Sequence, residues 1–124
     1  VGYTHAVADI DAASTFLQQF LSATPVYEAG RPAIGGRAVG LRIADVTVEL
    51  QTPVEEGALA AHLRRYGDGI RSTVFGVRNV DEARRYLADC RLPVAPGGTE
   101  ATITLPAEAN LGMMFEFAEH SGGQ

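Results

Sequence analysis

The sequence repeats itself, and this repeat most strongly limits what the chain can fold into. Residues 7–13, Val-Ala-Asp-Ile-Asp-Ala-Ala, recur as residues 77–83, Val-Arg-Asn-Val-Asp-Glu-Ala. In each copy a short strand-like run ends at Asp9 or Asn79, residue types that favour a helix N-cap. Apolar residues follow at spacings of three and four, which predicts one amphipathic helix in each copy. The first stripe comprises Ile10, Ala13, Leu17, Phe20 and Leu21, and the second comprises Val80, Ala83, Tyr86, Leu87 and Cys90.

After each helix the apolar pattern changes to a period of two, which is typical of strands. We expect strands over 25–28, 37–43 and 46–51 in the first half, and over 93–95, 100–105 and 113–118 in the second. Residues 55–66 predict an extra helix between the halves, ended by Gly67. The predicted order is therefore β-α-β-β-β, a linking helix, and β-α-β-β-β again, an α+β class.

The length favours a single domain. A chain of 124 residues, 46% of them hydrophobic, is long enough to bury a core without disulfides or structural metal. We expect one domain over 1–120, with half-repeats of about 1–53 and 70–119 and the linking helix at about 55–66. Residues 121–124 are expected to form a flexible tail.

Composition and charge exclude several classes of function. The chain has 10 basic and 15 acidic residues, a net charge of −5, and no basic run, which disfavours nucleic-acid binding. No apolar stretch approaches the ~18 residues of a membrane span, and no signal peptide is recognisable, so we expect a cytoplasmic protein. The single cysteine, Cys90, cannot form an internal disulfide.

Three segments carry a resemblance to a known family. Residues 57–70 read Gly-Ala-Leu-Ala-Ala-His-Leu-Arg-Arg-Tyr-Gly-Asp-Gly-Ile, residues 46–50 Val-Thr-Val-Glu-Leu, and residues 113–117 Met-Met-Phe-Glu-Phe. Together with the two modules, they resemble the vicinal-oxygen-chelate superfamily of glyoxalases, bleomycin-resistance proteins and extradiol dioxygenases, and within it most closely the methylmalonyl-CoA epimerases. The resemblance implies a curved eight-stranded mixed sheet around a concave cavity, a small-molecule substrate or ligand, and a homodimer.

The metal site of that family is only half present. Its members usually bind one divalent metal through four residues on four strands, two of them commonly histidines. The matching positions hold Gly2 and Ser72, whereas the two acidic positions are kept as Glu49 and Glu116. Zinc, nickel and cobalt favour imidazole ligands, although magnesium could use two carboxylates with water. We therefore expect no cofactor; if a divalent metal is bound, Glu49 and Glu116 are its ligands.

Strand alternation predicts which side chains face the cavity. Glu49 and Glu116 lie opposite the apolar residues that must pack under the helices. The functional interpretation is an acid–base pair in which one carboxyl group holds a proton; the alternative is two solvated glutamates. His5 is expected on the packed face, partly buried. The predicted substrate-binding residues are Gly2, Thr4, Arg71, Ser72, Val74 and Met114, with Arg71 meeting a carboxylate or a thioester-linked group or forming a surface salt bridge.

Three functions remain open. The first is a metal-free epimerase, isomerase or cyclase that moves a proton next to a carbonyl group, with Glu49 and Glu116 as the catalytic residues. The second is a non-catalytic binder of small molecules, as among the antibiotic-resistance members of the superfamily. The third is a metal-dependent enzyme of the methylmalonyl-CoA epimerase type.

Overall fold

The computed structural model describes residues 2–97, 99 and 101–119. The expected tail at 121–124 lies outside the described residues. The chain divides into two compact units, one over Gly2–Arg71 and the other from Ser72 onward, and each is described by itself. Strand β5 (Gly69–Val77) passes from the first unit into the second. No helix of the described residues is both long and apolar enough to cross a membrane.

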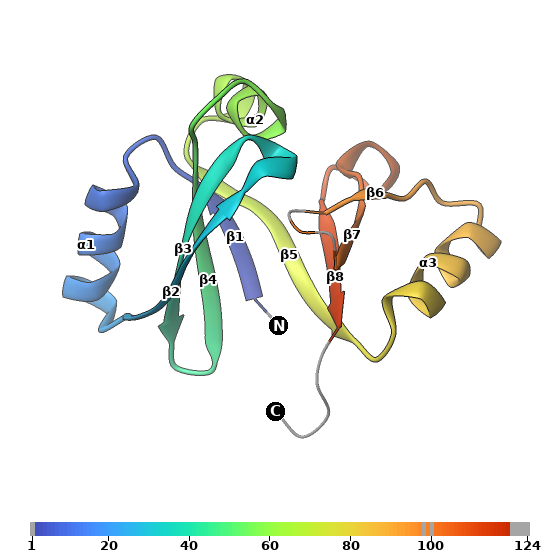
Figure 1. Cartoon of the computed structure of the whole chain (residues 1–124), viewed down its shortest axis with the longest axis horizontal. Helices are drawn as coiled ribbons and strands as arrows, with labels where there is room; N and C mark the ends of the chain where they lie inside the picture. Colours follow the sequence, from blue (N-terminus) through green and yellow to red (C-terminus); the bar gives the residue numbers. More distant parts are fainter. Residues whose placement is uncertain (1, 98, 100, 120–124) are drawn as a thin grey trace. The chain divides into compact units, whose positions relative to one another are not determined.

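The unit over Gly2–Arg71 is a four-stranded mixed sheet with two α-helices (Figure 1). Its strands lie in the order β2-β3-β4-β1; β1 pairs with β4 in parallel, and the other pairs are antiparallel. In chain order the elements are β1 (Gly2–Ala6), α1 (Ile10–Leu21), β2 (Thr24–Arg31), the 3-10 turn η1 (Pro32–Ile34), β3 (Gly36–Ile43), β4 (Val46–Pro53) and α2 (Ala58–Tyr66).

The second unit repeats this plan. Its strand order is β5-β8-β7-β6, and again the first strand pairs in parallel with the last. After β5 the elements are α3 (Val80–Asp89), β6 (Ala95–Pro96), β7 (Thr102–Leu105), the 3-10 turn η2 (Ala107–Ala109) and β8 (Phe115–Glu119). The predicted α+β class, with two β-α-β-β-β modules and a linking helix, is confirmed.

The repeated Asp/Asn positions start the two equivalent helices. Asp9 is the N-cap of α1, and its carboxylate accepts a hydrogen bond from the backbone N–H of Ala12 at 3.0 Å. Asn79 is the N-cap of α3, and its side-chain oxygen accepts from the backbone N–H of Glu82, also at 3.0 Å. Both bonds satisfy N–H groups that the helix itself leaves without a partner. The internal repeat therefore encodes the same helix start twice.

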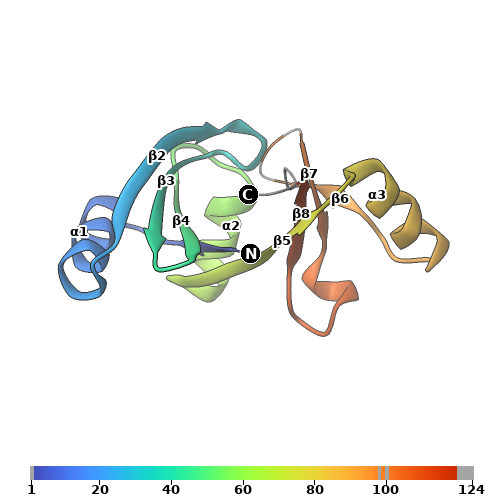
Figure 2. The same ribbon diagram turned by 90° about the horizontal axis from the view of Figure 1, so that it is seen from below.

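Each helix covers one face of its own sheet. Under α1 the core comprises Val7, Ile10, Ala23, Val39, Leu41 and Leu50. Under α3, which packs on β7 and β8 (Figure 2), it comprises Val80, Leu87 and Ile103, with Phe117 against them. A smaller cluster of Ala6, Ile34 and Leu59 anchors α2. The α1 and α3 clusters each occupy one face of their sheet. In the first unit the α2 cluster lies on the other face, beside the polar side chains, because Ala6 shares a strand face with Thr4.

Several expected details are wrong. Phe20 and Tyr86, members of the two predicted apolar stripes, are 67% and 68% exposed, and Leu21 and Cys90 are also exposed. Met113, an apolar residue of the strand expected over 113–118, is 49% exposed.

The strand and helix ends also differ from the expected ones. Strand β8 starts at Phe115, so Met114 precedes it. Strand β2 continues to Arg31, beyond its expected end at Glu28, because its ladder with β3 runs on as far as the pair Arg31–Gly36. The linking helix starts at Ala58, since Gly57 is its N-cap.

Candidate functional site

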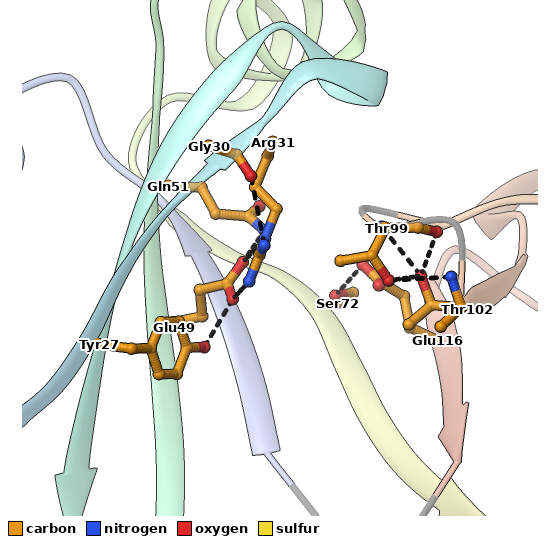
Figure 3. Close-up of polar contacts among 10 residues, drawn as sticks. Tyr27, Gly30, Arg31, Glu49, Gln51, Ser72, Thr99, Thr102 and Glu116 are labelled. Carbon is orange, nitrogen blue, oxygen red and sulfur yellow. Dashed lines mark hydrogen bonds and ion pairs between the residues drawn. The ribbon is translucent and has the colours of Figure 1, made fainter.

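The first polar cluster surrounds Glu49 in the unit over Gly2–Arg71 (Figure 3). The Tyr27 hydroxyl donates to Glu49 Oε1 at 2.6 Å, and the Gln51 amide Nε2 donates to Oε2 at 2.6 Å. Arg31 meets the same carboxylate with two N–H groups, Nη2 to Oε1 at 2.6 Å and Nε to Oε2 at 3.1 Å. The side chains of Arg31 and Glu49 are only 15% and 11% exposed, so this ion pair is largely shielded from solvent.

The strand register explains how side chains of β2 reach a carboxylate on β4. Tyr27 pairs with Gly40 on β3, and Gly40 pairs with Glu49. A Cβ atom at Gly40 would overlap the Tyr27 ring, so the ring lies directly over the glycine. Alternate residues share one face of a strand, and on β3 this face carries Gly36, Ala38 and Gly40. These small residues let the long side chains of β2 cross the intervening strand.

The electrostatics make Glu49 a fixed anion. Burial alone raises its pKa, but the hydrogen bonds from Arg31, Tyr27 and Gln51 outweigh burial and place the pKa below its ordinary value. Burial and the neighbouring carboxylate raise the pKa of Tyr27, so its hydroxyl stays protonated and donates. An ionised carboxylate has about four acceptor positions, and four donors among the described residues fill them.

The second polar cluster lies in the other unit, around Glu116 on β8. The Ser72 hydroxyl, on the adjacent strand β5, donates to Glu116 Oε1 at 2.9 Å, as Figure 3 also shows. Ser72 is 1% exposed and Glu116 is 4% exposed, so this bond is buried. In strand register Glu116 pairs with Val74. A hydroxyl bound to a buried carboxylate can orient that carboxylate and stabilise its charge.

The other predicted site residues are distributed as follows. Thr4 on β1 pairs with Glu49 in register and is buried. Gly2 approaches β4 so closely that a Cβ there would lie 2.7 Å from the Thr47 carbonyl oxygen, which leaves no room for a side chain. Arg71 is half-buried on β5, and Met114 is half-buried just before β8. The expected partial burial of His5 is found, and it lowers the pKa of this residue.

The residues at Glu49 do not fit a divalent metal. A guanidinium already neutralises the carboxylate, and its positive charge would repel a second cation in the same place. Gly2 has no side-chain ligand atom, and the Ser72 hydroxyl donates to Glu116. Within the described part of the chain, no three His, Cys, Asp or Glu side chains are grouped as a metal site requires. We therefore derive no step through a metal ion.

Sequence reasoning missed three members of the Glu49 cluster: Tyr27, Arg31 and Gln51. Strand alternation places Gln51 on the same face as Glu49, but its residue type alone indicates no role. Tyr27 and Arg31 were missed because β2 was expected to end at Glu28. A usable signal was present, since Tyr27, Ala29 and Arg31 alternate along one strand while Gly36, Ala38 and Gly40 alternate along the next.

Comparison with known proteins places the fold. Neither a family model nor a curated relative matches the chain. Solved structures do match it over nearly its whole length. A hypothetical protein, BH1468, from Bacillus halodurans C-125 has 22% identity and a TM-score of 0.87, with 99% of this chain and 94% of that chain covered.

Methylmalonyl-CoA epimerases are also among the similar structures. The enzyme of Mycobacterium tuberculosis has 22% identity and a TM-score of 0.87 over 97% of this chain and 86% of that one. A variant of the Streptomyces coelicolor enzyme in complex with 2-nitronate-propionyl-CoA has 19% identity and a TM-score of 0.89 over 98% and 93%. The chain thus has the same fold as these epimerases, as the sequence resemblance predicts.

Proposed function

We propose that the chain catalyses proton transfer next to the carbonyl group of an acyl substrate, an isomerase- or epimerase-type reaction, without a divalent metal at Glu49. The observation that carries this proposal is the buried Glu116 carboxylate, which is held by the Ser72 hydroxyl on a strand equivalent to the one that carries Glu49. The fold supports the reaction class, because similar structures are methylmalonyl-CoA epimerases, one of them in complex with methylmalonyl-CoA and NH4+.

The two glutamates have different roles in this proposal. Glu49 would have to give up a donor, and with it part of the Arg31 ion pair, before it could take a proton. Of the two glutamates predicted as catalytic, we therefore assign proton transfer to Glu116. Glu49 holds Arg31 and Tyr27 in place within the unit over Gly2–Arg71 and takes no part in the proton transfer.

In the proposed step a proton moves between the substrate and the Glu116 carboxylate. The carboxylate takes a proton from the carbon next to the carbonyl group, so the C–H bond breaks and an O–H bond forms on Glu116. The electron pair of the C–H bond moves toward the carbonyl oxygen and gives an enolate. A proton returned by Glu116 restores the original configuration and regenerates the carboxylate, whereas a proton delivered by water to the opposite face inverts the carbon and Glu116 then releases its own proton to solvent. Ser72 keeps the carboxylate oriented throughout.

Deuterium exchange tests this step directly. The protein is incubated with methylmalonyl-CoA and EDTA in D2O, and mass spectrometry follows deuterium at the carbon next to the thioester. We expect incorporation with the wild type, a loss of about 100-fold or more with Glu116→Gln, and a smaller loss with Ser72→Ala. Exchange that survives Glu116→Gln, or that appears only after a divalent metal is added, would contradict the proposal. Circular dichroism checks that the variants are folded.

A non-catalytic binder is the second candidate, and the Glu49 cluster favours it. A carboxylate whose acceptor positions are all filled is suited to shape a fixed binding wall and unsuited to exchange a proton. A binder predicts that methylmalonyl-CoA raises the unfolding temperature of wild type and Glu116→Gln equally while no deuterium is incorporated.

A further inference from the structure

The Arg31 guanidinium has donors that the Glu49 cluster does not use. A guanidinium carries five N–H groups. Nε and Nη2 donate to Glu49, and Nη1 donates to the carbonyl oxygen of Gly30 at 3.3 Å. One N–H of Nη1 and one of Nη2 therefore remain without a partner among the residues that the structure describes. The Arg31 side chain is 15% exposed, so it keeps some contact with solvent.

The orientation of Arg31 is fixed on two sides. The nearly buried Glu49 carboxylate binds the Nε–Nη2 edge. The guanidinium carbon also lies 5.9 Å from the centre of the Tyr27 ring, within the range of a cation–π contact, and the Tyr27 hydroxyl is bonded to the same carboxylate. Little conformational freedom is left for a ligand to remove when it binds, which favours recognition at this group.

We propose that the remaining N–H groups of Arg31, on Nη1 and Nη2, form a binding site for a carboxylate group of a ligand. A planar carboxylate matches two parallel N–H groups of a guanidinium. Glu49 has already neutralised the Arg31 charge, so the pair offers directed donors and little net positive potential. A singly charged carboxylate is therefore favoured over a dianion such as sulfate, which would face the charge of Glu49.

This site is independent of the proposed proton transfer, because it uses residues of the Gly2–Arg71 unit alone. It is also distinct from the prediction that Arg71 meets a substrate carboxylate. The Arg31 site assigns a class of ligand to this chain whether the chain is an enzyme or a binder.

The test is a titration of 15N-labelled full chain with sodium propionate, followed by NMR on the Arg31 Nε–H signal and the backbone amide of Gly30. We expect saturable shifts with a dissociation constant in the millimolar range. Propionamide, the neutral analogue, should give none, and sulfate should bind more weakly.

Three variants make the test specific. Arg31→Lys keeps the charge but loses the paired donors, so we expect about tenfold weaker binding. Arg31→Met should abolish saturable binding. Arg37→Met removes an exposed arginine of the neighbouring strand and should leave the affinity within about twofold, the size of effect expected at an independent site.

Several results would overturn the proposal. These are no saturable shift with the wild type, equal shifts with propionamide, sulfate binding as tight as propionate binding, or unchanged affinity in Arg31→Lys. Because Arg31→Met removes a shielded ion pair and can lose stability, Arg31→Lys is the deciding variant. Glu116→Gln should bind propionate as the wild type does, so failure of the proton-transfer proposal would be recognised separately.

Discussion

Replacing Arg31 by Met should destabilise the fold in a manner that depends on pH. The substitution keeps much of the aliphatic stem but removes the positive charge and two donors from a Glu49 side chain that is only 11% exposed. Removing one partner of a fully buried ion pair costs about 3–5 kcal/mol. Because both side chains keep some contact with water, we expect a loss of about 2–4 kcal/mol in the free energy of unfolding at pH 7.

The sign of the pH dependence follows from the pKa of Glu49. In the wild type the folded-state pKa lies below the ordinary value of 4.5, so the ionised carboxylate contributes stability above pH 4.5 and loses it as the pH falls through the folded-state pKa. In Arg31→Met the cation is absent, so the effect of burial on the Glu49 carboxylate outweighs the remaining hydrogen bonds. This should raise the folded-state pKa of Glu49. That variant gains stability on protonation where the wild type loses it. The difference between the two proteins should therefore shrink as the pH falls from 7 to 4.

Urea unfolding followed by circular dichroism at 222 nm measures this difference, and it suits a chain without tryptophan. Arg37→Met is the matched control, since it removes an exposed arginine from the neighbouring strand; we expect a change within about 0.5 kcal/mol. The double variant Arg31→Met/Glu49→Met should recover much of the loss, because it removes the uncompensated charge. A loss below about 1 kcal/mol, or one that stays constant between pH 7 and pH 4, would refute the reasoning.

Three further outcomes are expected. Gly40→Ala should push the Tyr27 ring off the sheet and weaken the hydrogen bond from its hydroxyl to the Glu49 carboxylate. We expect a loss of about 1–3 kcal/mol in the free energy of unfolding, and a much smaller loss when Tyr27 is already replaced by Ala. Asn79→Ala should cost about 1 kcal/mol by removing the cap bond to the Glu82 N–H, whereas Asn79→Asp should keep it; equal losses in urea unfolding would contradict the capping role. Leu59→Ala should cost about 2–5 kcal/mol, because the side chain is 0% exposed; a loss below about 1 kcal/mol in thermal or urea unfolding would contradict its anchoring of α2.

The fold was largely predictable because its signals are local. The repeated Asp9 and Asn79 positions mark both helix starts, and each helix is followed by a change of apolar period. The ends of elements were less accurate, since they depend on how far a partner strand or core extends. Tyr86 shows this limit: it fits the apolar stripe of α3 by spacing, yet it is 68% exposed while the next residue, Leu87, is buried.

The site was only half predictable for a similar reason. Alternation along one strand was enough to place Glu49 on the polar face. Its partners Tyr27 and Arg31 come from β2, one strand beyond its neighbour β3, and their position depends on the β2–β3 register, which shifts between Pro25 and Tyr27. A register set by a bulge cannot be read from side-chain types alone.

The cluster also shows how the sheet compensates a buried carboxylate. Glu49 cannot be ionised in this place without opposite charge and donors, since burial alone raises its pKa. Arg31 on β2 can supply both only if the side chains of β3 leave room for it to reach across that strand. The small residues Gly36, Ala38 and Gly40 leave this room. The small residues of β3 and Arg31 of β2 therefore act together to stabilise the negative charge of the buried Glu49 carboxylate. Because the Tyr27 ring lies over Gly40 and its hydroxyl donates to the same carboxylate, filling the space above Gly40 should also disturb the hydrogen bonding of Glu49.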